Sequence, residues 1–160
     1  MTRMLVCGDR NWIDRRFPDG TRDDMLSFWV HDQTLDVLLT IAKAHNVDTV
    51  IEGCARGADR CGEDFAEKYP GLIKNLLHFP ANWNEYGKSA GPRRNIQMLD
   101  EGKPDFVVAF HDNLMESKGT RHMVGIADNA GVPVYGYSTD IIYERAKDKR
   151  RRAEGARALD

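Results

Sequence analysis

The sequence has no long hydrophobic run and no excess of charge of one sign. Its 160 residues carry 23 Lys and Arg against 25 Asp and Glu, a formal net charge of −2. A chain so close to neutral has no overall attraction for nucleic acid or for an anionic membrane surface. No apolar stretch approaches the ~20 residues that span a bilayer. We therefore expect neither a membrane protein nor a nucleic-acid partner.

Cysteine is scarce as well. Cys7, Cys54 and Cys61 form no CxxC pair and no zinc-binding spacing, and their odd number does not make a disulfide framework. The sequence therefore predicts no metal site. Its start, Met1 to Met4, lacks the apolar region of a signal peptide. These features together predict a protein of the reducing cytoplasm.

Apolar runs alternate with helical patterns along the chain. With 41% hydrophobic and 30% charged residues, the composition is that of one ordinary globular domain. Strands that alternate with helices indicate a mostly parallel sheet covered on both faces. We predict a Rossmann-like three-layer α/β sandwich of about five strands over residues 1–137, followed by a charged helix or tail over 138–160. The expected strands are 4–7, 49–51, 72–79, 106–110 and 132–135.

Two segments between these strands carry further expectations. Residues 80–92 are polar and are expected to form a long loop, in which Trp83 and Tyr86 either stack on a base or pack the loop down. A long helix is expected after the first strand. The residues predicted to mark its buried face are Met25, Phe28, Trp29, Leu35, Leu38, Leu39 and Ala42.

The segment Glu52-Gly-Cys-Ala-Arg-Gly-Ala-Asp59 joins a strand to a helix and is the first candidate for a ligand site. Gly53 and Gly57 permit positive φ and close approach of a ligand to the backbone. Free amides at the start of the next helix favour an anion such as phosphate, and Arg56 adds a planar positive charge. A tight structural turn is the alternative, because the spacing matches neither GxGxxG nor a Walker loop.

Three more polar stretches lie at the same predicted edge of the sheet, where ligands gather in parallel α/β folds. Gly8-Asp9-Arg10 follows the first strand, Gly91-Pro-Arg-Arg-Asn95 opens a helix, and Gly119-Thr120 opens another. Arg93 and Arg94 oppose the helix dipole, a conflict that a shared anion would resolve. The alternatives are a solvated turn, arginines paired with acids elsewhere, and a plain N-cap threonine.

Four stretches in combination resemble the YspA-type SLOG family. They are residues 53–59, residues 81–83 with 87–95 and Met98, the strand ending at Phe110, and Gly119-Thr120 with Met123-Val124. SLOG proteins are Rossmann-like relatives of the DNA-uptake protein DprA and of the LOG phosphoribohydrolases, and they are frequent in bacteria and phages. The resemblance covers roughly residues 3 to 135.

The resemblance implies a pocket for a nucleotide or nucleotide-derived small molecule at the C-terminal edge of the sheet. A homo-oligomer and a bound Mg²⁺ ion are both compatible with it. Asp9 departs from the family pattern, which has a small hydroxyl residue there, and a carboxylate repels phosphate unless a metal or ribose hydroxyl meets it. The residues that the resemblance and the loops assign to the pocket are Gly8, Asp9, Arg10, Gly53, Arg56, Gly57, Asp59, Arg93, Arg94, Asn95, Gly119 and Thr120.

Two functions follow from this resemblance. The first is binding or sensing of a nucleotide-like ligand. The alternative is a hydrolase that cleaves an N-glycosidic or phosphate bond, but LOG enzymes carry a catalytic glutamate in a GTxxE motif. Here Gly119-Thr120 is followed by Arg121-His122-Met123, so that glutamate is absent. The candidates to replace it are Asp59, Glu52, Asp9 and Asp112, with Arg94 holding the phosphate.

Overall fold

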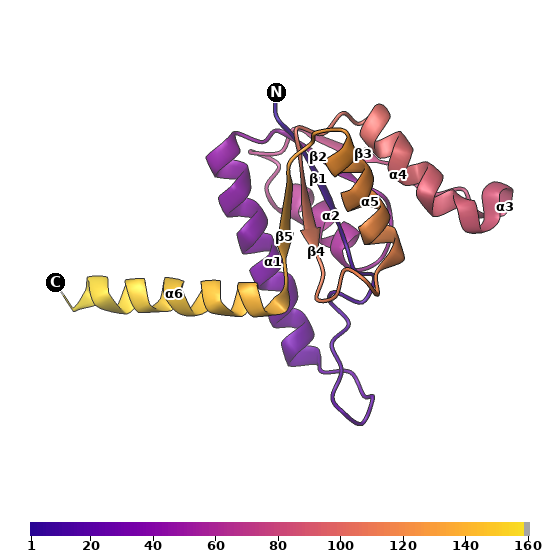
Figure 1. Cartoon of the computed structure of the whole chain (residues 1–160). Coiled ribbons are helices and arrows are strands. Elements are labelled where there is room, and N and C mark those ends of the chain that lie inside the picture. The colour runs from indigo at the N-terminus through magenta and orange to yellow at the C-terminus, as the bar shows by residue number, and fades with distance from the viewer. Residues whose placement is uncertain (159–160) are drawn as a thin grey trace.

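The computed structural model describes residues 1–158 and shows an α/β protein built on one sheet (Figure 1). All neighbouring strands pair in parallel, in the order β3-β2-β1-β4-β5, which confirms the predicted Rossmann-like fold class. Within residues 1–158, no helix combines the length and apolar content needed to cross a bilayer. The strands are β1 (Arg3–Gly8), β2 (Thr49–Glu52), β3 (Asn75–His78), β4 (Phe106–Phe110) and β5 (Val134–Tyr137).

Helices cover both faces of this sheet. Side chains of β1 alternate between the faces, so Met4 and Val6 pack with α1 and α2, whereas Leu5 and Cys7 pack with α4 and α5. The helices are α1 (Asp24–His45), α2 (Ala58–Lys68), α3 (Trp83–Tyr86), α4 (Ala90–Asp100), α5 (Lys118–Asn129) and α6 (Thr139–Arg157), with a 3-10 turn η1 (Gly87–Ser89) between α3 and α4. These layers form the predicted sandwich.

The chain changes direction in the sheet between β1 and β4. It runs outward from β1 to β3 and then returns to β4 on the other side of β1. The loops that follow β1 and β4 therefore part at this point, which is where open α/β sheets bind ligands. The backbones are close here: the Asp9 amide donates to the Phe110 carbonyl at 2.8 Å, and a Cβ on Gly8 would lie 2.7 Å from that of Ala58.

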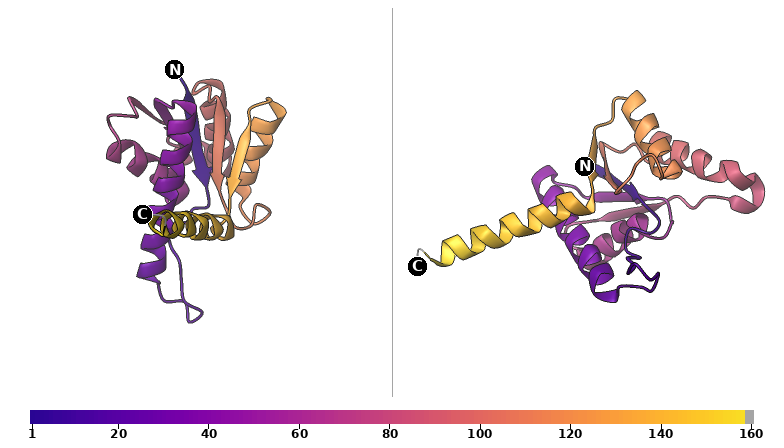
Figure 2. Two further views of the ribbon diagram at one scale, coloured as in Figure 1. Left: turned by 90° about the vertical axis from the view of Figure 1, so that its left-hand side faces the viewer. Right: turned by 60° about the horizontal axis from the view of Figure 1, so that its bottom comes forward.

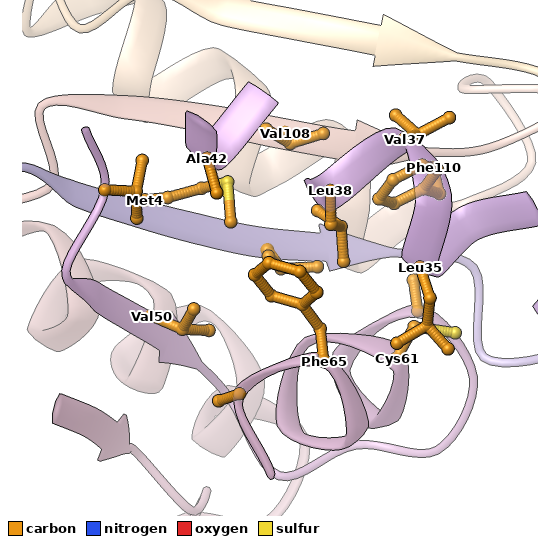
Figure 3. Close-up of a cluster of buried hydrophobic side chains, with 14 of the residues drawn as sticks. Met4, Leu35, Val37, Leu38, Ala42, Val50, Cys61, Phe65, Val108 and Phe110 are labelled. Carbon is orange, nitrogen blue, oxygen red and sulfur yellow. The ribbon is translucent and has the colours of Figure 1, made fainter. Parts of the chain in front are cut away.

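The larger core lies between the sheet, α1 and α2 (Figure 3). Phe65 of α2 is fully buried there, and its ring points into the space between the sheet and α1. Leu38 of α1 and Val50 of β2 belong to the same cluster. Burial of such an aromatic ring is among the larger single contributions to the stability of a domain of this size.

The predicted buried face of the first helix is partly wrong. Leu35, Leu38 and Ala42 are buried as expected, but Met25 and Phe28 are 85% and 73% exposed. The reason is visible in Figure 1, where the first turns of α1 continue beyond the ends of the strands. No sheet lies beneath those turns to cover their apolar side chains.

The predicted loop over residues 80–92 is wrong as well. Most of the segment is helical, because α3 and η1 lead directly into α4, which begins at Ala90. Asn82 starts α3 by accepting a hydrogen bond from the Glu85 amide at 3.1 Å, and Gly87 interrupts the helical path with a φ of +52°. In addition, β3 is shorter than predicted and β5 lies two residues further along the chain.

Helix α6 leaves the sheet and points away from it (Figures 1 and 2). Its first turns pack on α1 through the buried Ile142 and an ion pair of 2.7 Å between Arg145 and Asp36. The helix lies within residues 138–160, for which the sequence predicted a charged helix or tail, and the last two residues of that segment lie outside the described ones.

We expect Phe65→Ala to lower the free energy of unfolding by about 3–5 kcal/mol, because it removes a buried ring and leaves a cavity. Phe28→Ala is a matched control, since its exposed ring should change stability by less than about 0.5 kcal/mol. Urea unfolding of both variants checks this expectation. Similar losses in the two variants would contradict the placement of the core.

Candidate functional site

A pocket of about 410 Å³ lies where β1, β2 and β3 end. Arg10 reaches it from the loop after β1, Arg56 from the loop after β2, and Arg94 from α4. We call it the arginine pocket. Its size falls in the range of small-molecule sites. The remaining residues that line it are Gly53, Cys54, Ala55, Pro80, Ala81 and Trp83.

Arg94 joins α4 to the loop after β2. Its side chain is only 10% exposed, and its Nη1 donates a hydrogen bond to the Gly53 carbonyl. A Cβ on Gly53 would lie 2.6 Å from the guanidinium carbon of Arg94. A side chain at position 53 would therefore push the Arg94 guanidinium out of its present position.

Arg10 and Arg56 are exposed and carry charges that no acidic side chain balances. Within residues 1–158, no carboxylate oxygen lies within 4.0 Å of either guanidinium group. Arg56 donates a hydrogen bond to the neutral Asn11 side chain at 3.2 Å, and Arg10 lies over the Trp83 ring at 5.4 Å from its centroid. Both cations therefore remain available to an anion.

Asp59 holds the loop from inside. Its Oδ2 accepts hydrogen bonds from the amides of Gly53 at 3.1 Å and Ala55 at 3.3 Å, and lies 4.0 Å from Nη1 of Arg94. Burial raises the pKa of Asp59 to about 7, although the Arg94 guanidinium opposes the shift. Near neutral pH the carboxyl is therefore only partly ionised and neutralises Arg94 incompletely.

The backbone amides of this loop are mostly engaged within the protein. The Cys54 amide donates to Glu52 at 2.5 Å, and the Ala58 amide at the start of α2 donates to the Asp9 carbonyl at 3.2 Å. The expectation of a free first amide is wrong for Ala58, because the loop after β1 supplies it with an acceptor. An anion at this loop would therefore meet the guanidinium groups and the remaining amides, and not the amides of Gly53, Cys54, Ala55 or Ala58.

Gly57 brings two loops together. It has a φ of +81°, and a Cβ there would lie 2.7 Å from the backbone carbon of Arg10. Any side chain at this position would separate the loop after β1 from the loop after β2. Gly57 thus places Arg10 near Arg56 without lining the pocket itself.

Several predicted site residues do not line the arginine pocket. Arg93 is exposed and lies over the Tyr86 ring at 4.4 Å. Asn95 is buried and donates to the Gly119 carbonyl at 3.1 Å, and the hydroxyl of the buried Thr120 accepts from Ser117 at 2.6 Å. These contacts hold α4 against the start of α5. A direct role of these residues in ligand binding stays a prediction.

The acidic candidates also have structural partners. Asp9 accepts a hydrogen bond from the Asp112 amide at 3.3 Å. Asp112 pairs with Arg15 at 2.7 Å and accepts from the Thr139 amide at 2.8 Å, and these contacts lower the pKa of Asp112. Glu52 is fully buried at the end of β2. None of these carboxylates lines the arginine pocket.

A second cluster beside the pocket was not predicted. Glu52, Cys54 and His78 bring one sulfur, one nitrogen and one oxygen within 4.8 Å of one another, as in groups that can hold a metal ion. Little in the sequence indicated this cluster, because His78 lies 24 positions after Cys54 and the two form no recognised metal-binding motif. The pairing becomes visible only once β2 and β3 are aligned in parallel, with Glu52 opposite His78.

The strand order and the pocket at the carboxyl ends of the strands define a Rossmann-like α/β protein with a candidate anion site. The chain is 34% identical to the Gene 61 protein of Mycobacterium phage D29 over 140 aligned residues. The alignment covers 86% of this chain and 97% of the phage protein. The chain belongs to the family of that phage protein. No protein-family model matches the sequence.

We expect Asp59→Asn to flatten the pH dependence of stability. Asp59 has an ordinary pKa of 3.8 and a value of about 7 in the folded protein, so over this interval the folded state holds a proton that the unfolded state has released. Its contribution to stability is therefore complete below pH 3.8 and is lost as the pH rises through 7, by roughly 1 kcal/mol per pH unit.

The measurement is urea unfolding of the wild type and the variant at pH 5, 6, 7 and 8. Asparagine keeps an acceptor for the loop amides, so the difference between the two proteins isolates the ionisation. Equal slopes with pH would show that Asp59 titrates normally.

Proposed function

We propose that this chain binds a nucleotide or nucleotide-derived small molecule in the arginine pocket. The observation that carries the proposal is the convergence of three guanidinium groups from three separate segments, two of them without a carboxylate partner within residues 1–158. We further propose that the chain and its phage relative are SLOG-type proteins. The motifs around residues 53–59 and 87–95 support that assignment.

A phosphate group is the chemistry that suits these cations. A guanidinium offers planar, paired donors to a tetrahedral or planar oxyanion and stays charged at any physiological pH. Arg94 is already fixed by its hydrogen bonds to Gly53 and Asn95, so little side-chain freedom is lost when it binds.

A base or other flat ring suits the opposite side of the pocket. Trp83 lines the pocket and is 49% exposed, so a face of its indole is accessible for stacking. Arg10, which lies near that ring, would contact both a stacked base and its phosphate. The other aromatic candidate, Tyr86, does not line the pocket, and the Arg93 guanidinium lies over its ring.

The hydrolase alternative has less support from the site. Cleavage of an N-glycosidic bond needs a carboxyl group beside the reacting sugar. Glu52 and Asp59 are buried and accept hydrogen bonds from the loop, and among residues 1–158 no carboxylate lines the arginine pocket. Binding therefore accounts for the arrangement better. The cytoplasmic location and the homo-oligomer stay expectations from the sequence.

We expect Arg10→Ala and Arg56→Ala each to weaken nucleotide binding by about 10- to 100-fold, the value of a charge-assisted hydrogen bond. Neither guanidinium balances a carboxylate, so the fold should tolerate both changes. Arg150→Ala, on the exposed part of α6, is the matched control and should bind as the wild type does.

A panel of nucleoside mono-, di- and triphosphates, screened by thermal shift and followed by calorimetry in EDTA, provides the measurement. Failure of every nucleotide to bind would overturn the proposal. So would affinities for the Arg10 and Arg56 variants equal to that of the Arg150 control.

A further inference from the structure

We propose that Glu52, Cys54 and His78 form a binding site for a zinc ion beside the arginine pocket. Glu52 is the last residue of β2, His78 is the last residue of β3, and the two stand opposite each other in the parallel ladder. Cys54 follows Glu52 by two residues and turns its thiol toward both. Within residues 1–158, this is the group of His, Cys and carboxylate side chains that brings three ligand atoms together.

The spacing of the ligand atoms fits a tetrahedral ion. Zn–S bonds of about 2.3 Å and Zn–N or Zn–O bonds of about 2.0 Å place neighbouring ligand atoms roughly 3.3–3.6 Å apart. Sγ of Cys54 lies 3.5 Å from Oε1 of Glu52 and 3.8 Å from Nδ1 of His78. The carboxylate and the imidazole contact each other directly, and that pair would open to admit the ion.

The donor set selects the metal. One thiolate, one imidazole and one carboxylate suit Zn²⁺ or another late first-row divalent ion, whereas Mg²⁺ and Ca²⁺ prefer oxygen ligands alone. Three protein ligands leave a fourth position for water or for a ligand group. Cys54 also lines the arginine pocket, and His78 lines the adjoining groove of about 970 Å³, so the site borders both.

The local backbone supports the arrangement. Cys54 has a φ of +59°, which is uncommon for a residue with a Cβ and costs about 1 kcal/mol or more. Its amide donates to Oε2 of Glu52 at 2.5 Å, which orients the carboxylate so that Oε1 faces the thiol and the imidazole. Hydrogen bonds of this kind position the ligands of metal sites.

A cysteine nucleophile with a histidine base is the competing interpretation of these residues. In that arrangement the thiol contacts one ring nitrogen and the carboxylate orients the ring through the other. Here Sγ of Cys54 and Oε1 of Glu52 both face Nδ1 of His78. These three atoms therefore surround one point, which is the arrangement of metal ligands and not that of a nucleophile, a base and an orienting carboxylate in sequence. When the ion binds, the thiol proton leaves to solvent.

The test uses EDTA-treated protein, with Zn²⁺ titrated by calorimetry and Co²⁺ as a spectroscopic probe. We expect one equivalent of metal and a cobalt–thiolate charge-transfer band. Cys54→Ser should abolish the band, and Cys54→Ser and His78→Gln should each weaken zinc binding at least tenfold. Both side chains are partly exposed, so both variants should fold, as circular dichroism will show.

His31→Gln is the matched control, because His31 pairs with Asp64 at 2.8 Å and does not belong to the group of Glu52, Cys54 and His78, so this change should not alter zinc binding. Absence of the cobalt–thiolate band would overturn the proposal. Equal zinc affinity in the wild type and in a Cys54→Ser, His78→Gln double variant would also overturn it. No nucleotide is present, so the result is independent of ligand binding in the arginine pocket.

Discussion

The contact between the Arg94 guanidinium and the Gly53 backbone is the interaction on which the arginine pocket depends. It brings a side chain from α4 across the end of the sheet to the loop after β2, into space that a Cβ would otherwise fill. Because Arg94 is nearly buried, its position is set by the packing around it rather than by solvent. Arg94 therefore has little side-chain freedom left to lose, which would lower the entropic cost of the binding that we propose.

Two buried carboxylates fix the same loop from below. Asp59 accepts from the amides of Gly53 and Ala55, and Glu52 accepts from the amide of Cys54. Buried polar groups of this kind are tolerated because hydrogen bonds compensate for lost hydration. They also occupy the amides of Gly53, Cys54 and Ala55, which are then not free to bind a phosphate. The loop is thus held by hydrogen bonds on its buried side, and under the proposed function the guanidinium groups are what attracts the anion.

The sequence was sufficient for the fold class and for the approximate positions of most elements. The alternation of apolar runs and helical patterns predicted the parallel sheet, and right-handed crossovers between its strands placed the loops with Arg10, Arg56 and Arg94 at one edge. The sequence could not show which of Arg93 and Arg94 faces the pocket. Neighbouring residues on a helix point about 100° apart, and only packing decides which one faces inward.

Other features depended on tertiary structure that no local pattern contains. The exposure of Met25 and Phe28 follows from how far α1 extends beyond the sheet, and the meeting of Cys54 with His78 follows from the register of β2 with β3.

The most direct test of the account is an NMR titration with the tightest-binding nucleoside phosphate. We predict that the Trp83 indole N–H and the Nε–H signals of Arg10, Arg56 and Arg94 shift together while those of Arg150 and Arg151 do not. Shifts confined to α6, or none at the arginine pocket, would contradict it.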